Sequence, residues 1–204
     1  MRYLMIWAVL LAGLSSCTTA PKGPQPLPFL GNHEINGQDT VYHTIPPFSF
    51  ISQDSLAVTN GTFEGKAYVA DFFFISCPTI CPKVKKNMLR IYDKYQGNDD
   101  LLLLSHTIDP KRDTVGRLKQ YADNLGVASQ KWFFVTGEKD DIYAIADDYM
   151  SIAKEDPEAP GGFDHSGWVL LIDKQGHIRS FADGTDAAKV DQFMQDIDWL
   201  LANE

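Results

Sequence analysis

The chain has 204 residues, of which 44% are hydrophobic, and this suits one domain with a sizeable core. Its formal net charge is −9, so nucleic acid is not an expected partner. Of its three cysteines, one lies in the N-terminal leader, and the other two are too few for the disulfide framework of a small secreted scaffold.

The N-terminus has the pattern of a bacterial lipoprotein signal. Arg2 supplies a positive charge, residues 4–14 form an apolar run, and Leu14-Ser15-Ser16-Cys17 places small residues before a cysteine. The apolar run is shorter than the roughly 20 residues that span a bilayer. We expect residues 1–17 to be a signal peptide with Cys17 lipidated; the alternative is an uncleaved N-terminal anchor. Either way, the protein is expected in the bacterial cell envelope, exported and membrane-anchored on the periplasmic side.

Residues 18–43 are predicted to be a flexible tether and N-terminal extension, because several prolines in the first half favour extended chain. The domain proper is expected to span residues 44–204. It begins with an edge hairpin formed around Thr44–Phe50 and Ala57–Thr59, because the Pro46-Pro47 pair excludes a helix.

Apolar runs then alternate with amphipathic stretches. Ala67–Ile75 is typical of a strand buried on both faces, and Val84, Met88 and Tyr95 lie on one face of the helix that follows. The later elements are predicted in this order: strand Leu101–His106, a helix capped by Asp113 and stopped by Gly126, strand Trp132–Val135, a helix around Ile142–Tyr149, a loop over Ser151–Ser166, strands Trp168–Ile172 and His177–Phe181, and a helix over about Asp186 to Leu201. This order predicts an α/β fold of the thioredoxin-like type, with a mixed sheet flanked by helices and an N-terminal β-hairpin extension.

Two cysteines lie where the first core strand meets its helix, in the sequence Cys77-Pro78-Thr79-Ile80-Cys81-Pro82. Pro82 suits the first turn of a helix, where its missing N–H costs no hydrogen bond. The free N–H groups and the helix dipole at this end favour a thiolate. A disulfide that closes so short a loop stabilises a fold little. We therefore expect the pair to do chemistry, and to form a Cys77–Cys81 disulfide when oxidised; the alternative is a structural bridge or two inert buried thiols.

Three motifs in order resemble the Sco/SenC family of copper chaperones for cytochrome c oxidase. They are Val69-Ala70-Asp71-Phe72-Phe73-Phe74 before the cysteine loop, Thr107-Ile108-Asp109-Pro110 followed by Arg112-Asp113-Thr114, and Asp164-His165-Ser166 before the last hairpin. The resemblance implies a thioredoxin-like fold, an exported membrane-anchored domain, and copper, as Cu(I) or Cu(II), held by Cys77, Cys81 and His165. The implied partners are the copper-site subunit of cytochrome c oxidase or another copper carrier, and a thiol reductant.

This chain departs from that family in two places. A lipoprotein signal stands where a transmembrane anchor is commoner, and Gly161-Gly162-Phe163 precedes the Asp-His-Ser motif. The ligand types support copper without the resemblance, since soft thiolates select Cu(I) and imidazole suits both oxidation states. Zinc also accepts these ligands, but a structural zinc site normally takes a fourth protein ligand, and none is evident in the sequence.

The remaining histidines have less specific readings. His33 and His43 are predicted to be solvated, near the tether, and His177 to be a surface residue of the last hairpin. His106 ends the second core strand, so it is either a core histidine or a partner of the metal ligands.

Two acidic residues are placed near the site. Asp164 either accepts a hydrogen bond from His165 and orients it, or serves only the turn. Asp109 is predicted to form a turn at the rim, with an effect on metal or partner access as the alternative.

Two other functions use the same cysteines. A thiol-disulfide oxidoreductase acting on exported proteins needs only the pair; Cys77, expected to be the more exposed, would attack and Cys81 would resolve the mixed disulfide. A peroxidase is less well supported, because Thr79 lies between the cysteines instead of before a single attacking one.

Overall fold

The computed structural model describes residues 26–37 and 39–204. The predicted signal with Cys17, and the first part of the predicted tether, lie outside the described residues. Within the described residues, no helix has both the length and the apolar character needed to cross a membrane.

The core is a seven-stranded mixed sheet in the order β11-β10-β5-β6-β7-β3-β4. Its centre is parallel and consists of β5 (Ala67–Phe73), β6 (Leu101–Thr107) and β7 (Trp132–Thr136). An antiparallel hairpin, β10 (Trp168–Ile172) and β11 (Ile178–Asp183), extends it beside β5. Every residue of β5 and β6 is buried, as their apolar runs predict.

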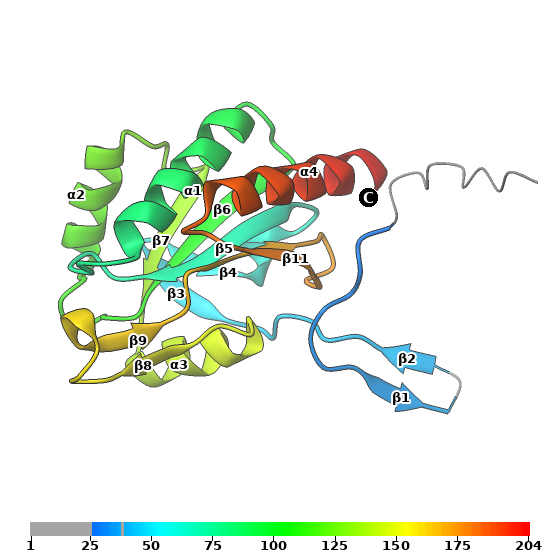
Figure 1. The fold of residues 1–204 in the computed structure, drawn as a ribbon, viewed down its shortest axis with the longest axis horizontal. Coiled ribbons are helices and arrows are strands. Elements are labelled where there is room, and N and C mark those ends of the chain that lie inside the picture. Colours follow the sequence, from blue (N-terminus) through cyan, green and yellow to red (C-terminus); the bar gives the residue numbers. More distant parts are fainter. Residues whose placement is uncertain (1–25, 38) are drawn as a thin grey trace, which may run out of the picture.

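Four helices cover the sheet. Helices α1 (Cys81–Tyr95), α2 (Val115–Leu125) and α4 (Ala187–Asn203) lie on one face, and α3 (Lys139–Asp148) lies on the other (Figure 1). Asp186 caps α4 by accepting hydrogen bonds from two backbone N–H groups of its first turn. The layered arrangement confirms the predicted thioredoxin-like fold class.

Two hairpins precede β5 in the chain. Strands β3 (Ser49–Ser52) and β4 (Ala57–Thr59) form the predicted edge hairpin, and β3 pairs antiparallel with β7. Strands β1 (Glu34–Asn36) and β2 (Asp39–Val41) form a separate hairpin that projects from the body (Figure 1). The N-terminal hairpin extension is thus confirmed.

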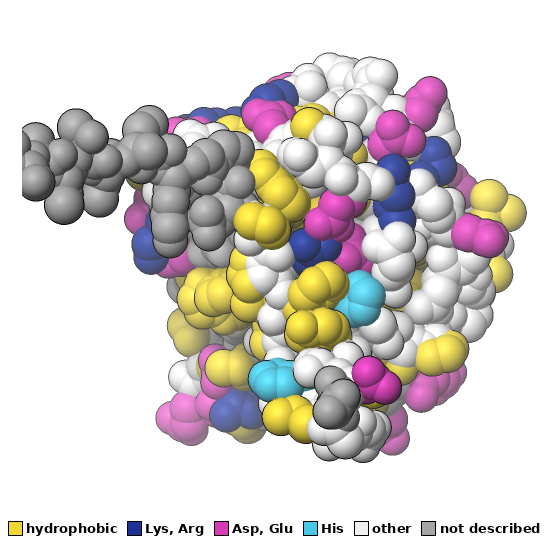
Figure 2. Space-filling model, turned by 90° about the vertical axis from the view of Figure 1, so that its right-hand side faces the viewer, with side chains coloured by type: hydrophobic (Ala, Val, Ile, Leu, Met, Phe, Trp, Pro, Cys, Tyr) yellow, Lys and Arg dark blue, Asp and Glu magenta, His cyan; other side chains and the backbone are white. Residues whose placement is uncertain are grey.

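The segment before β1 lies against the domain. The Leu30 N–H donates to the Ile178 oxygen over 2.8 Å. Arg179 donates to the Leu27 carbonyl over 2.8 Å, and its guanidinium lies 4.3 Å from the ring centroid of Phe29. Apolar side chains gather at this end of the molecule (Figure 2). These contacts attach the segment to the end of the sheet where β11 begins.

The segment Ser151–Ser166, predicted as a loop, contains a two-stranded sheet. Strand β8 (Ala153–Glu155) pairs antiparallel with β9 (Phe163–His165), and a single 3-10 turn, Pro160–Gly162, precedes β9. The prediction was wrong here because three-residue strands are too short to show a hydrophobic period. The correction matters, since His165 ends β9.

Candidate metal centre

The cysteines lie at the junction of β5 and α1. Cys77 is in the loop that follows β5, and Cys81 is the first residue of α1, with Pro82 second. A proline fits there because the first N–H groups of a helix have no intrahelical acceptor. Both cysteines are free thiols. This junction is the one that the sequence predicts.

His165 lies over both sulfurs. Its Nε2 atom is 3.2 Å from Sγ of Cys81 and 3.7 Å from Sγ of Cys77. The three ligand atoms all lie within 4.8 Å of one another. The fold therefore brings together two neighbouring cysteines and a histidine that is 84 residues beyond the second of them. Two sulfurs and one nitrogen form a compact donor set suited to a soft metal ion.

The two thiols have similar exposure but different acidity. Cys77 is 6% exposed and Cys81 is 5%, so both thiols are buried and Cys77 is the more exposed only by a small margin. Burial raises the pKa of Cys77, but hydrogen bonds, among them those from the backbone N–H groups of Thr79 and Cys81, together lower it by more. The net pKa of Cys77 is therefore below its usual value. Burial raises the pKa of Cys81 well above that of an ordinary thiol. Cys77 is therefore the thiol that ionises first.

The imidazole is in the form that binds a metal. Burial lowers the pKa of His165 below its usual value, so the ring is neutral at pH 7. A neutral imidazole has a nitrogen lone pair available, and Nε2 is the atom that faces the sulfurs. The ring also packs edge-on against Phe74, with centroids 5.2 Å apart.

Asp113 holds the strand end that leads into the cysteine loop. Its Oδ2 accepts hydrogen bonds from the Ile75 N–H over 2.9 Å and from the Thr107 hydroxyl over 2.7 Å. The predicted role of Asp113 as the cap of α2 was wrong, because Thr114 is the N-cap residue. The buried carboxylate fixes the backbone two residues before Cys77.

The two acids predicted near the site have different surroundings. Asp109 is 4% exposed and accepts a hydrogen bond from the Arg112 guanidinium in the turn after β6. Asp164 lies 3.3 Å from the Lys154 ammonium across the β8–β9 hairpin. Among the described residues no hydrogen bond joins Asp164 to His165, so the structure favours the turn reading of Asp164.

His106 belongs to the core and not to the site. It is fully buried, and its ring stacks on Phe72 with centroids 4.9 Å apart and lies 5.6 Å from the ring of Tyr149. Neither ring nitrogen has a hydrogen-bond partner in the described part of the chain. Of the two readings from the sequence, the structure supports the core histidine.

Burial of His106 is expected to make the protein sensitive to acid. Burial lowers its pKa from 6.5 to about 3 in the folded state. Because the unfolded chain takes up this proton first, the unfolding free energy should fall as the pH drops from 6.5 toward 3, by about 1.4 kcal/mol for each pH unit. His106→Leu, of similar volume, should therefore flatten the fall in unfolding free energy between pH 6.5 and 4. Denaturant unfolding at several pH values measures this, and equal slopes in parent and variant would contradict it.

Of the three remaining histidines, one is less solvated than predicted. His33 is exposed, as expected. His43 is half-buried, with Nε2 2.8 Å from the Asp148 carbonyl oxygen. His177 is also half-buried and precedes β11, and its Nδ1 lies 3.1 Å from the Asp173 carboxylate. The prediction for His43 failed because the N-terminal segment that carries it folds back onto the domain, whereas His177 stays partly exposed in the last hairpin.

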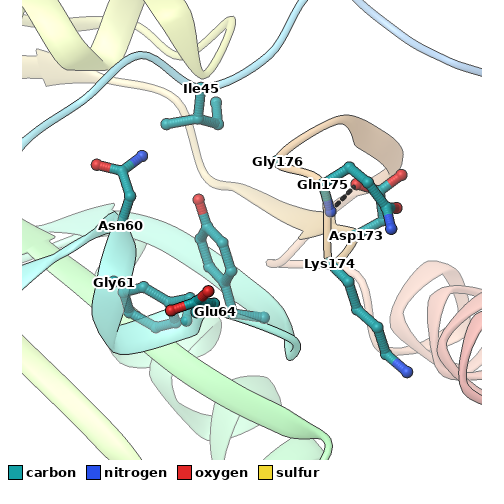
Figure 3. A pocket seen from close by; sticks show the side chains of 10 residues that line it. Ile45, Asn60, Gly61, Glu64, Asp173, Lys174, Gln175 and Gly176 are labelled. Carbon is teal, nitrogen blue, oxygen red and sulfur yellow. Dashed lines mark hydrogen bonds between the residues drawn. The ribbon is translucent and has the colours of Figure 1, made fainter.

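A separate cavity lies at the opposite end of β5 (Figure 3). It measures about 310 Å³, and its lining includes Ile45, Glu64, Tyr68 and Asp173. Asp173 is occupied by hydrogen bonds within its own turn, including one from the Gln175 N–H over 2.9 Å. Neither cysteine nor histidine is among the described residues that line this cavity. Soft metal ligands gather at the cysteine end of the sheet instead.

The chain has clear relatives. The family model described as SCO1/SenC matches residues 36–202. A SCO1/SenC family lipoprotein from Bacillus anthracis is similar in structure, with a TM-score of 0.71 and 25% identity, over 78% of this chain and 95% of that one. BsSco, a member of the Sco family of cytochrome c oxidase assembly proteins that has a disulfide switch, has a TM-score of 0.69 and 27% identity, over 79% of this chain and 95% of that one. Arabidopsis thaliana ScoI with copper bound has a TM-score of 0.66 and 25% identity, over 78% of this chain and 98% of that one.

Proposed function

Because this chain belongs to the SCO1/SenC family, we propose that it is an exported, membrane-tethered copper chaperone that delivers copper to cytochrome c oxidase during assembly. The observation that carries this proposal is the group formed by Cys77, Cys81 and His165, whose ligand atoms lie within 4.8 Å of one another. Proteins of similar structure include one solved with copper bound and one from a family of oxidase assembly proteins. The recipient would be the copper-site subunit of the oxidase or another copper carrier.

The chemistry of the three side chains fits a carried metal. Two thiolates bind Cu(I) well, and the imidazole nitrogen adds a ligand that suits Cu(II). Cys81, with its raised pKa, must lose its proton to the solvent when the metal binds, so metal affinity should rise with pH. Three ligands leave a coordination position that a recipient's ligand can enter.

Removal of the imidazole tests the assignment. In His165→Ala we expect loss of the intense Cu(II)–thiolate absorption and weaker binding of Cu(I), because two thiolates alone hold Cu(II) poorly and tend to reduce it. The disulfide between the cysteines should still form, since exchange needs only the two sulfurs. Visible absorption spectra with Cu(II), and anaerobic competition for Cu(I) against a chromophoric chelator, measure both effects on the full chain.

The matched control is the buried histidine. His106→Ala should keep the copper spectrum of the parent, because that ring lies in the core among Phe72 and Tyr149. If the His165 variant bound both copper states like the parent, the ligand assignment would be wrong.

A thiol-disulfide oxidoreductase is the second candidate, and the unequal acidity of the two thiols favours it. The pKa of Cys77 is lowered, so its thiolate is available to attack a disulfide, while Cys81 lies close enough to resolve the mixed disulfide. Strong reductase turnover in a protein that releases Cu(I) at once to a moderate chelator would favour this candidate.

The tether is a further part of the proposal. The similar protein from Bacillus anthracis is described as a lipoprotein, and Leu14-Ser15-Ser16-Cys17 has the pattern of a lipid-attachment site. In Cys17→Ser, lipid labelling should be lost and the precursor should stay unprocessed, because the sulfur is the lipid acceptor. Gel mobility and metabolic labelling with a fatty acid measure this. Unchanged processing would refute lipidation at this residue.

A further inference from the structure

His165 lies on a strand that is not part of the main sheet. Among the described residues, β8 and β9 pair only with each other, and the seven-stranded sheet contains neither. The hydrogen bonds of the main sheet therefore do not fix the imidazole above the sulfurs. The chain enters β10 three residues after His165, and contacts made by the segment that leads into β9 fix its other side.

That segment turns at Gly161, directly against the cysteine loop. The φ angle of Gly161 is +81°, in the left-handed region that favours glycine. A Cβ atom at this position would lie 2.8 Å from the ring of Phe74 and 3.2 Å from Cδ of Pro78, which lies between the two cysteines. The backbone thus approaches the loop more closely than another residue type allows.

Arg112 also binds this turn. Its Nη2 donates to the Gly161 carbonyl oxygen over 3.2 Å, and its Cζ lies 5.5 Å from the ring centroid of Phe163. Its Nε donates to the carboxylate of Asp109. The Asp109 side chain is 4% exposed and that of Arg112 is 48%, so a buried carboxylate holds a half-exposed guanidinium in place.

The turn after β6 thereby contacts both halves of the site. Asp113, one residue beyond Arg112, binds the backbone of Ile75 on the cysteine side. Arg112 binds Gly161 on the histidine side. A single short turn therefore links the two halves.

From this geometry we infer that Arg112 is a positioning residue of the metal centre. Paired with Asp109, it binds the Gly161 carbonyl and so holds His165 over the two cysteine sulfurs. The inference rests on the proposed function, because it takes His165 as a copper ligand.

The direct test is the Cu(I) affinity of Arg112 variants. Arg112→Met in the full chain should bind Cu(I) about 10-fold more weakly, the effect typical of residues that orient a ligand. Arg112→Lys keeps the charge but lacks the two-pronged geometry, so it should recover only part of the loss. The control is Arg90→Met. Arg90 lies further along α1, is 38% exposed and also binds a carboxylate, that of Asp191 on α4. This variant should bind Cu(I) like the parent.

Two readouts separate positioning from a general loss of structure. In a His165→Ala background, Arg112→Met should weaken Cu(I) binding no further, because the group that it positions is absent. In the metal-free protein, hydrogen exchange should accelerate in residues 161–166 of Arg112→Met and not in those of Arg90→Met. The Ser166 N–H, which donates to the Ile152 oxygen, is one suitable reporter.

The outcomes are distinct. The inference would be overturned if Arg112→Met bound Cu(I) like the parent, or if it lost the same Cu(I) affinity with and without His165. Unchanged hydrogen exchange in residues 161–166 would also overturn it. If the parent bound no Cu(I), or His165→Ala bound it as tightly as the parent, the proposed function would fail. Hydrogen exchange in the metal-free protein would still show whether Arg112 holds the segment.

Discussion

Replacement of either cysteine by serine is expected to abolish Cu(I) binding while the protein stays folded. A serine hydroxyl is a hard ligand and is not ionised at neutral pH, so it cannot replace a thiolate on a soft metal ion. Cys77→Ser and Cys81→Ser should each lose at least about 100-fold in affinity, more than a residue that only orients a ligand. Anaerobic competition against a Cu(I) chelator measures the loss.

The fold should tolerate both changes, although both sulfurs are buried. Sγ of Cys77 lies 3.7 Å from the Thr79 hydroxyl oxygen, and Sγ of Cys81 lies 3.2 Å from Nε2 of His165, so each new hydroxyl has a hydrogen-bond partner. We expect a loss of only about 1 kcal/mol in unfolding free energy. Ser76→Ala, at an exposed neighbouring position, is the control for both measurements. Unfolded serine variants would show that the pair is structural.

The placement of the cysteines was predictable because it depends on local sequence. Ala67–Ile75 is an apolar run, and the residues after Pro82 have helical periodicity, so a strand-to-helix junction follows from short-range pattern alone. Parallel strands then bring their carboxyl ends to one edge of the sheet. The structure has both features, with β5 ending at Phe73 and α1 beginning at Cys81.

The contacts that hold the site together were not predictable in this way. The hydrogen bond from Ile75 to Asp113 spans 38 residues, and that from Arg112 to Gly161 spans 49. An aspartate before a helix is most simply read as its cap, and nothing nearby in the sequence shows that its carboxylate turns inward. His165 was placed from a family resemblance, because no local pattern connects it with the cysteines.

A buried ion pair near the site was not predicted either, because its two residues are also brought together only by the fold. Asp71 lies in the apolar run of β5, and Lys85 lies beside the buried face of α1. The structure buries both, with the Lys85 ammonium 2.8 Å from the Asp71 carboxylate and 3.1 Å from the Ser105 hydroxyl. Lys85 also lies 4.2 Å from the ring centroid of Phe73. Pattern analysis counts charged residues as exposed, and only the packing of the helix on the sheet brings these two together.

Loss of one member of this pair is expected to have the largest effect on stability. Lys85→Met would leave the Asp71 carboxylate buried, with the Ser105 hydroxyl as its side-chain partner. Removing one partner of a buried ion pair typically costs about 3–5 kcal/mol, because an unpaired charge stays in the interior. Denaturant unfolding at pH 7 should show a loss of this size. The exposed pair Lys94–Asp198, on α1 and α4, supplies the control, since Lys94→Met should cost about 1 kcal/mol or less.

A further measurement identifies the cause of that loss. The double variant Asp71→Leu, Lys85→Met should be more stable at pH 7 than Lys85→Met alone, because no buried charge remains. A double variant no more stable than the single one would indicate lost packing of the lysine side chain and not an unpaired carboxylate. Since Lys85 lies one turn beyond Cys81 in α1, the ion pair also fixes the helix whose first residue is a proposed copper ligand.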